Sequence, residues 1–181
     1  MPELVLPDER YQESFLAAMA EFRAEGRGSD DDHTSIGHHL RAFGTAWHTA
    51  DGFAGYVAQL RAEADPTRPR PDGIVACTTW WWVAGTEYLG RIAVRHELTD
   101  RLRVVGGHIG YDIRQSARRL GHATAMLRAV LPRARELGVV PAALLTCDAD
   151  NIGSQTVITA NGGVLADQND SVLRYWVPTA G

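Results

Sequence analysis

The segment from Gly106 to Gly163 constrains the fold of this chain more than any other part of it. It opens with a β-type run that ends at Ile113, and a long helix with one apolar face is expected soon afterwards, over Leu120–Leu137. A buried strand is expected over Val139–Cys147 and a short helix over Asn151–Ala160. Strands that alternate with helices in this way predict helices packed on a mixed sheet.

The rest of the chain adds strands and helices of the same kind. The remaining predicted elements are strands over Leu4–Leu6, Val75–Val83, Tyr88–Arg95, Val164–Leu165 and Val172–Val177, and helices from Asp8, over Ile36–Phe43 and over Gly52–Ala64. His96–Val105 is expected to be a linking loop. The chain has 181 residues and no internal repeat, so we expect residues 1–181 to form a single α/β (α+β) domain.

Composition excludes several classes of function. The 18 basic and 22 acidic residues give a net charge of −4, which argues against a nucleic-acid partner. The sequence contains no run of about 18 apolar residues, so we expect no membrane-spanning helix, and the N-terminus lacks a signal-peptide pattern. Two cysteines, Cys77 and Cys147, are too few for a disulfide framework, so we expect a reducing, cytoplasmic location. Every basic residue is arginine, which excludes a lysine Schiff base.

Two arginines and a glycine stand at the start of the long predicted helix. Gly121 has no side chain, so a ligand can approach its backbone closely. The N–H groups of a first helical turn and the helix dipole attract anions, and Arg118 and Arg119 add planar donors for phosphate oxygens. The combination predicts a phosphate or pyrophosphate site. A plain helix start with solvated arginines is the alternative.

In this segment the sequence resembles the GCN5-related N-acetyltransferases, the GNAT superfamily. The family's acyl-CoA loop reads Arg/Gln-x-x-Gly-x-Gly/Ala, and Arg118–Ala123 matches it between a strand and a helix. Leu144–Ser154 resembles the family's second strand-to-helix junction, and Asn161–Gly163 matches the glycine after its last helix. The resemblance covers residues 106–163, the expected acyl-CoA core, and extends loosely over 73–105.

The resemblance implies a fold and a set of contacts to coenzyme A. The fold is a mixed, mostly antiparallel sheet flanked by helices, with splayed central strands at Gly107–Ile113 and Ala143–Cys147. The backbone of the first of these strands would pair with the pantetheine arm like an added strand. The implied coenzyme A contacts are Tyr111, Asp112, Ile113, Arg118, Arg119, Leu120, Gly121, His122, Ala123, Thr124, Asn151 and Ser154.

The resemblance also implies an activity. The implied activity is acetyl-CoA-dependent N-acetyl transfer, in which a primary amine of a small-molecule acceptor would attack the thioester directly. Two alternatives stay open. One is an acyltransferase that uses another acyl-CoA or a hydroxyl acceptor, and the other is a coenzyme A-binding sensor with little turnover.

The sequence leaves two candidates for the group that protonates the leaving thiolate. Many GNAT enzymes carry a tyrosine seven residues after the junction asparagine, and this chain has Ile158 there. The proton then comes from Tyr111 or from solvent. Strand alternation places Tyr111 on the same face as Ile109 and Ile113, which looks like a core face and favours solvent.

The base that deprotonates the amine is also open. Many relatives carry a glutamate on the strand before the acyl-CoA loop, and the matching position here lies near Gly107, with His108 beside it. His108 titrates in the range that a general base needs. Glu87, in a predicted turn, is the second candidate. A strand histidine satisfied by a neighbour and an exposed turn carboxylate are the corresponding structural alternatives.

No metal site is predicted, because the spacing of His33, His38, His39 and His48 matches no compact zinc pattern. The adjacent residues Trp80–Trp82 must point to both faces of their strand. Either all three pack in the core, or at least one lines a cleft or an interface, which leaves a homodimer open.

Overall fold

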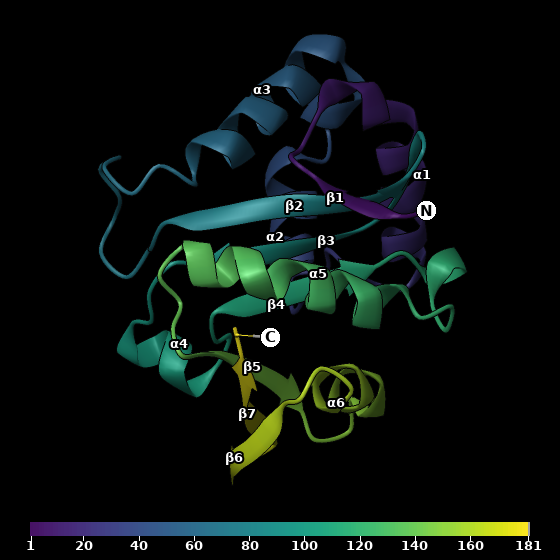
Figure 1. The fold of residues 1–181 in the computed structure, drawn as a ribbon. Coiled ribbons are helices and arrows are strands. Elements are labelled where there is room, and N and C mark those ends of the chain that lie inside the picture. The colour runs from purple at the N-terminus through teal and green to yellow at the C-terminus, as the bar shows by residue number, and fades with distance from the viewer. Residues whose placement is uncertain (181) are drawn as a thin grey trace.

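The structure is a computed structural model and describes residues 1–180. Its strands form two antiparallel sheets (Figure 1). The first sheet has four strands in the order β1 (Glu3–Val5), β2 (Cys77–Ala84), β3 (Glu87–Arg95) and β4 (Ile109–Ile113). The second has three, in the order β5 (Ala142–Asp148), β7 (Val172–Pro178) and β6 (Val164–Asn169).

Helices cover both faces of the first sheet (Figure 1). One core cluster joins β2 and β3 to α1 (Gln12–Ala24), α2 (Ser35–Phe43) and α3 (Ala50–Ala62). The other cluster lies on the opposite face and joins the two sheets to α5 (His122–Glu136) and α6 (Ile152–Thr159). The predicted α/β class, with antiparallel sheets flanked by helices, is confirmed. Within residues 1–180 no helix is long and apolar enough to cross a membrane.

The three adjacent tryptophans divide between these two clusters. Trp80 and Trp82 pack with α5, whereas Trp81 packs with α1 to α3 and is fully buried. The ring of Phe15 from α1 stacks on Trp81, with 5.3 Å between the ring centroids. All three indoles are therefore core residues, and none of them forms an exposed cleft wall or interface.

The two sheets meet at one point and separate beyond it. The N–H of His108 donates to the Leu144 carbonyl at 2.7 Å, and the N–H of Leu144 donates to His108 Nδ1 at 2.9 Å. A third bond joins the Gly106 N–H to Thr146 Oγ1 at 2.9 Å. Past this junction β4 and β5 belong to different sheets, so each ends one sheet at the gap. The predicted splayed strands are the ones that flank this gap.

Two local predictions were wrong. The long helix begins at His122 rather than Leu120, because Gly121 adopts a left-handed conformation with φ of 82° that ends the preceding irregular segment. Leu120 is consequently 68% exposed and outside the core. The expected linking loop over His96–Val105 contains a short helix, α4 (Asp100–Val104), because Thr99 Oγ1 accepts a hydrogen bond from the Leu102 N–H at 3.2 Å.

We predict that Gly107→Ala destabilises the fold by at least about 2 kcal/mol in urea unfolding. Gly107 has φ of 60°, and a Cβ there would lie 2.3 Å from the Leu144 carbonyl oxygen, so the junction must open. The control is Gly110→Ala on β4, three residues further along the chain, where only Arg95 Nη1 comes as near as 4.0 Å. The control should stay within about 0.5 kcal/mol of the parent. Equal losses in the two variants would contradict the role of the junction.

Candidate functional site

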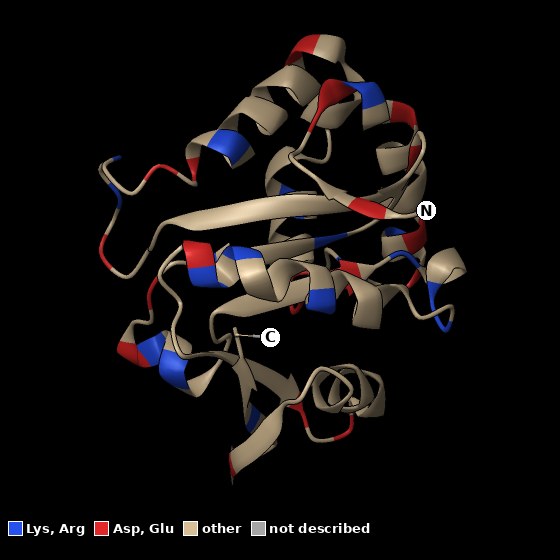
Figure 2. Cartoon of the chain, viewed as in Figure 1, with Lys and Arg blue, Asp and Glu red and all other residues tan. Residues whose placement is uncertain are grey.

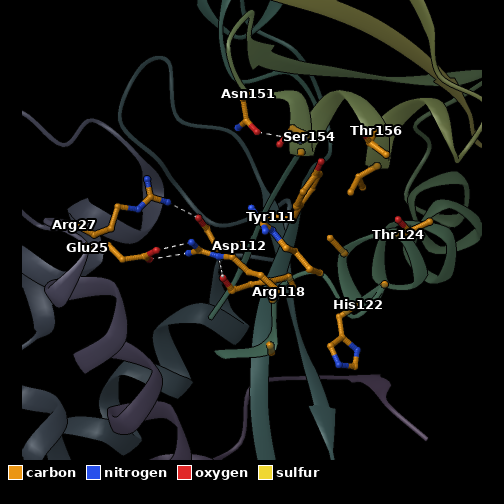
Figure 3. Close-up of a pocket in the computed structure, with 17 residues that line it drawn as sticks. Glu25, Arg27, Tyr111, Asp112, Arg118, His122, Thr124, Asn151, Ser154 and Thr156 are labelled. Carbon is orange, nitrogen blue, oxygen red and sulfur yellow. Dashed lines mark hydrogen bonds and ion pairs between the residues drawn. The ribbon is translucent and has the colours of Figure 1, made fainter. Parts of the chain in front are cut away.

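A cavity of about 750 Å³ lies at the open end of the gap between the sheets. It is bounded by β4, by the N-termini of α5 and α6, and by the loop after α1 (Figure 3). The lining residues are Glu25, Arg27, Tyr111, Asp112, Ile113, Ala117, Arg118, Arg119, Gly121, His122, Ala123, Thr124, Asn151, Gly153, Ser154, Thr156 and Val157. Every residue predicted to contact coenzyme A is among them except Leu120, whose side chain points away into solvent.

The N-terminus of α5 gives the cavity a site for an anion. Gly121 caps the helix without a side chain, and no side-chain acceptor covers the first turn. The first intrahelical bond is from the Ala125 N–H to the Gly121 carbonyl, so the N–H groups of His122, Ala123 and Thr124 lack an acceptor within the helix. A Cβ on Gly121 would meet nothing within 4 Å, which leaves the backbone open to a ligand. These groups suit a pyrophosphate.

The two arginines before this turn have different roles. The Arg118 guanidinium forms a bidentate pair with Glu25, with 2.7 Å between Nη2 and Oε2, and its Nε donates to the Ile113 carbonyl at 2.9 Å (Figure 3). Arg118 lines the cavity, but three of its five N–H donors hold the loop to α1 and β4, so two remain for a phosphate. Arg119 is exposed and has no ion pair within residues 1–180, so it keeps its donors for a phosphate.

A second carboxylate of α1 holds the same loop. Glu21 Oε1 accepts from Arg114 Nε and Ser116 Oγ, both at 2.9 Å, and Oε2 accepts from the Ser116 N–H at 2.9 Å. Burial opposes ionisation of Glu21, but hydrogen bonds from Arg114 and Ser116 outweigh it and lower the pKa of Glu21 to about 2. Sequence reasoning missed this anchor.

The available signal was a matched spacing of charges. Glu21 and Glu25 are four residues apart on a helix, and Arg114 and Arg118 are four apart in the loop. A pattern of this kind gives no partner by itself, because about 93 residues separate the two members of each pair.

Hydrogen-bond alternation along β4 decides which backbone groups face the gap. The bonds from Arg95 N–H to His108 O and from Arg114 N–H to Leu89 O direct the even-numbered residues of β4 toward β3. The backbone N–H and carbonyl groups of Asp112 therefore point toward β3. This corrects the expectation that they hydrogen-bond to pantetheine. The backbone of Tyr111 faces the gap instead. Asp112 lines the cavity through its side chain, which pairs with Arg27 at 2.7 Å.

Tyr111 also contributes a hydroxyl group. Its ring packs against the core cluster beside α5, as alternation predicts, but it also lines the cavity. The hydroxyl is buried and has no hydrogen-bond partner of normal geometry within residues 1–180, although it lies near Ser154 (Figure 3). Burial raises the pKa of Tyr111 to about 12, with the Ser154 side chain partly opposing the rise. The phenol is therefore a donor that lacks an acceptor.

The α6 end of the cavity is built by a capping residue. Asn151 Oδ1 accepts from the Ser154 N–H at 3.0 Å, and both side chains line the cavity. The cap leaves the Asn151 amide nitrogen and the Ser154 hydroxyl for a ligand. Ile158, one turn further along α6, is 1% exposed and packs in the core.

Neither candidate base lines this cavity. Leu144 N–H can only donate, so His108 Nδ1 is its acceptor and the ring hydrogen of neutral His108 is on Nε2. Burial, followed by Arg103 and Arg95, lowers the pKa of His108 to about 4, so the ring is neutral near pH 7. In this arrangement His108 has no lone pair left to accept a proton. Glu87 has a side chain 57% exposed and lies 3.8 Å from Arg114.

The described residues contain no metal site. Within residues 1–180 no three His, Cys, Asp or Glu side chains gather closely enough to hold a metal ion.

Comparison with known proteins identifies the family. The family model described as an acetyltransferase (GNAT) domain matches residues 29–164, three quarters of the chain. The chain therefore belongs to the GNAT acetyltransferases, as its resemblance over residues 106–163 predicts. No curated protein matches it in sequence.

Solved structures show the same fold at low sequence identity. The microcin C7 self-immunity acetyltransferase MccE, in complex with acetyl-CoA and AMP, has a TM-score of 0.63 and 13% identity, with 98% of this chain and 92% of that one covered. Mycobacterium smegmatis RimJ, in complex with CoA-disulfide, has a TM-score of 0.67 and 16% identity, with coverage of 98% and 81%. The Vibrio fischeri ribosomal-protein-S5-alanine acetyltransferase has a TM-score of 0.67 and 10% identity, with coverage of 99% and 93%.

We predict that the stability gap between the parent and Glu21→Gln depends on pH. The pKa of Glu21 is about 2 in the folded protein against an ordinary 4.5, so its stabilisation is complete above 4.5 and disappears as pH falls toward 2. Urea unfolding at several pH values should show a gap that is widest near neutral pH and narrows in acid. Glu13→Gln, an exposed change on the same helix, should show no such narrowing. A gap that is constant with pH would exclude the Glu21 anchor.

Proposed function

We propose that this protein is an acetyl-CoA-dependent N-acetyltransferase that acts on a primary amine of a small-molecule acceptor by direct attack. The observation that carries the proposal is the glycine-opened N-terminus of α5, which faces a cavity that continues to the gap beside Tyr111. A helix start alone is weak support. The continuity of an anion site with an edge strand that has unpaired backbone groups suits a pyrophosphate joined to a pantetheine arm.

Each part of the cavity has a role in holding the donor. The N–H groups of His122, Ala123 and Thr124 would bind the pyrophosphate, and Arg119 would bind a terminal phosphate. The backbone of Tyr111 would pair with the pantetheine amides across the gap. Glu21 and Glu25 would act as positioning residues, because they hold the loop that precedes the anion site.

The chemistry then follows from the two groups nearest the gap. The amine nitrogen bonds to the carbonyl carbon, the carbon–sulfur bond breaks and the electron pair leaves with the sulfur. The Tyr111 hydroxyl, buried without an acceptor, would hydrogen-bond to the developing thiolate. Because its pKa is about 12, the phenol stabilises the thiolate by donation and keeps its proton. With His108 Nδ1 engaged, the amine proton would leave to water.

One observation favours a second candidate, a coenzyme A-binding module with little turnover. Ile158 occupies the position where many relatives carry a tyrosine, and it is buried, so that helix offers no acid. Thiol release measured with acetyl-CoA and a panel of amines separates the two candidates. Binding of coenzyme A without amine-dependent thiol release would favour the module.

We predict that Gly121→Val weakens coenzyme A binding by at least about tenfold, or about 1.4 kcal/mol, in calorimetry. The valine side chain would fill the space through which the pyrophosphate reaches the backbone. Gly138→Val is a matched control, because Gly138 lies at the other end of α5 with φ of 88° against 82° and is equally open. The control carries the same backbone strain and should bind normally. Unchanged binding by Gly121→Val would contradict the site.

We predict that Tyr111→Phe lowers kcat about tenfold and leaves the affinity for coenzyme A within about twofold. The change removes only the hydroxyl that would meet the sulfur as its charge develops. Tyr175→Phe, a buried change on β7 outside the cavity, should leave kcat unchanged. An unaltered kcat for Tyr111→Phe would assign stabilisation of the thiolate to solvent.

A further inference from the structure

A second cavity, of about 500 Å³, lies where β4 and β5 begin, beside the junction of His108 and Leu144. His108 lines this cavity, whereas Tyr111 and Asp112, further along β4, line the first one. The second cavity is enclosed by the start of β5, by β7 and by the segment around α4. Its lining residues are Leu98, Arg103, His108, Val140, Pro141, Ala142 and Trp176.

The polar side chains of this cavity are donors. Because His108 Nδ1 accepts from Leu144, the remaining ring nitrogen carries hydrogen and can only donate. Arg103 adds a guanidinium from α4, whose basic residues are visible in Figure 2. The backbone of Arg103 is fixed by Arg174 Nη1, which donates to its carbonyl at 3.0 Å. No acidic side chain of residues 1–180 lines the cavity, so its charge complements an anion.

The rest of the wall is apolar and includes an exposed indole. Trp176 is 40% exposed, whereas each of the other four tryptophans of the chain is buried. Val140 and Pro141 are exposed beside it, and Leu98 closes the opposite wall. An exposed indole next to a cation and a donor suits a compound with an apolar body and a carboxylate.

The strand β4 leads from this cavity toward the gap. Gly110 is two residues beyond His108, on the same face of β4, which is a distance of roughly 7 Å along the strand. A Cβ on Gly110 would meet only Arg95 Nη1, at 4.0 Å, so Gly110 adds no side chain of its own on this face. A molecule whose carboxylate lies at Arg103 and whose chain follows β4 past Gly110 would bring an amine toward the gap.

We infer that this cavity binds the acceptor and that the acceptor is an amine with a carboxylate several bonds away, held by Arg103 and His108 against Trp176. The inference rests on the proposed acetyl transfer for the role of the bound molecule. The binding site itself is independent of that role. The first test therefore measures binding without catalysis, and the second measures acceptor preference.

The binding test is a titration followed by NMR, with benzoate as the probe and benzamide as its neutral match. Benzoate should shift the Trp176 indole signal, assigned with Trp176→Phe, whereas benzamide should not. Arg103→Gln should weaken the benzoate response at least about tenfold. Arg101→Gln is the matched control, since Arg101 is exposed on the same helix and outside the cavity. Equal responses to the two probes, or equal effects of the two variants, would overturn the site.

The preference test compares straight-chain ω-amino carboxylates with the matching ω-amino amides as acceptors. The parent should prefer a carboxylate by at least about tenfold in kcat/KM, mainly through KM, and Arg103→Gln should remove the preference while Arg101→Gln keeps it. Benzoate binding without this preference would overturn the acceptor role and leave the cavity as an effector site. Absence of transfer to any amine would overturn both the proposed function and the acceptor role. The benzoate titration would then decide whether the cavity binds a carboxylate.

Discussion

The bonds between His108 and Leu144 decide the geometry on which the rest of this site depends. They close the two sheets against each other at one end of β4, and Gly107 permits this because a Cβ there would collide with the Leu144 carbonyl. Beyond the junction, β4 has a neighbouring strand on one side only. The backbone of Tyr111 then points into a gap that an extended ligand arm can fill.

The anion site at α5 depends on a different interaction, the hold of α1 on the loop before it. A glycine in the left-handed conformation at a helix start has few contacts that restrain its backbone. A Cβ placed on Gly121 would meet no atom within 4 Å. Glu21 and Glu25 supply the restraint by binding Arg114, Ser116 and Arg118. Glu25 lines the cavity, but its charge is paired with the Arg118 guanidinium, which offsets the repulsion that a free carboxylate would exert on a phosphate.

The features that depend on local sequence patterns could be predicted from the sequence. The features that depend on contacts between residues far apart in the chain could not. Periodicity found every strand and the main helices, and the motif around Gly121 located the cavity. No local pattern could show that Arg118 is bound by Glu25, or that His108 would accept from Leu144 and lose its use as a base. The short helix α4 was missed because its five residues have no apolar periodicity, although Thr99 is a good cap.

Alternation along β4 gives the two faces of the gap different chemistry. Tyr111 faces the coenzyme A side with a buried hydroxyl, and burial raises its pKa, whereas His108 is a half-buried imidazole whose pKa burial lowers. A tyrosine is uncharged near neutral pH in any case, and the lowered pKa keeps His108 uncharged there as well. Asp112 and Arg27 neutralise each other in the coenzyme A cavity, whereas Arg119 and Arg103 form no ion pair among residues 1–180 and stand further out. Arg95 lies beside Gly110 and donates to the Gly106 and Gly107 carbonyls, so the end of the gap next to the junction has a positive charge that can attract a developing negative one.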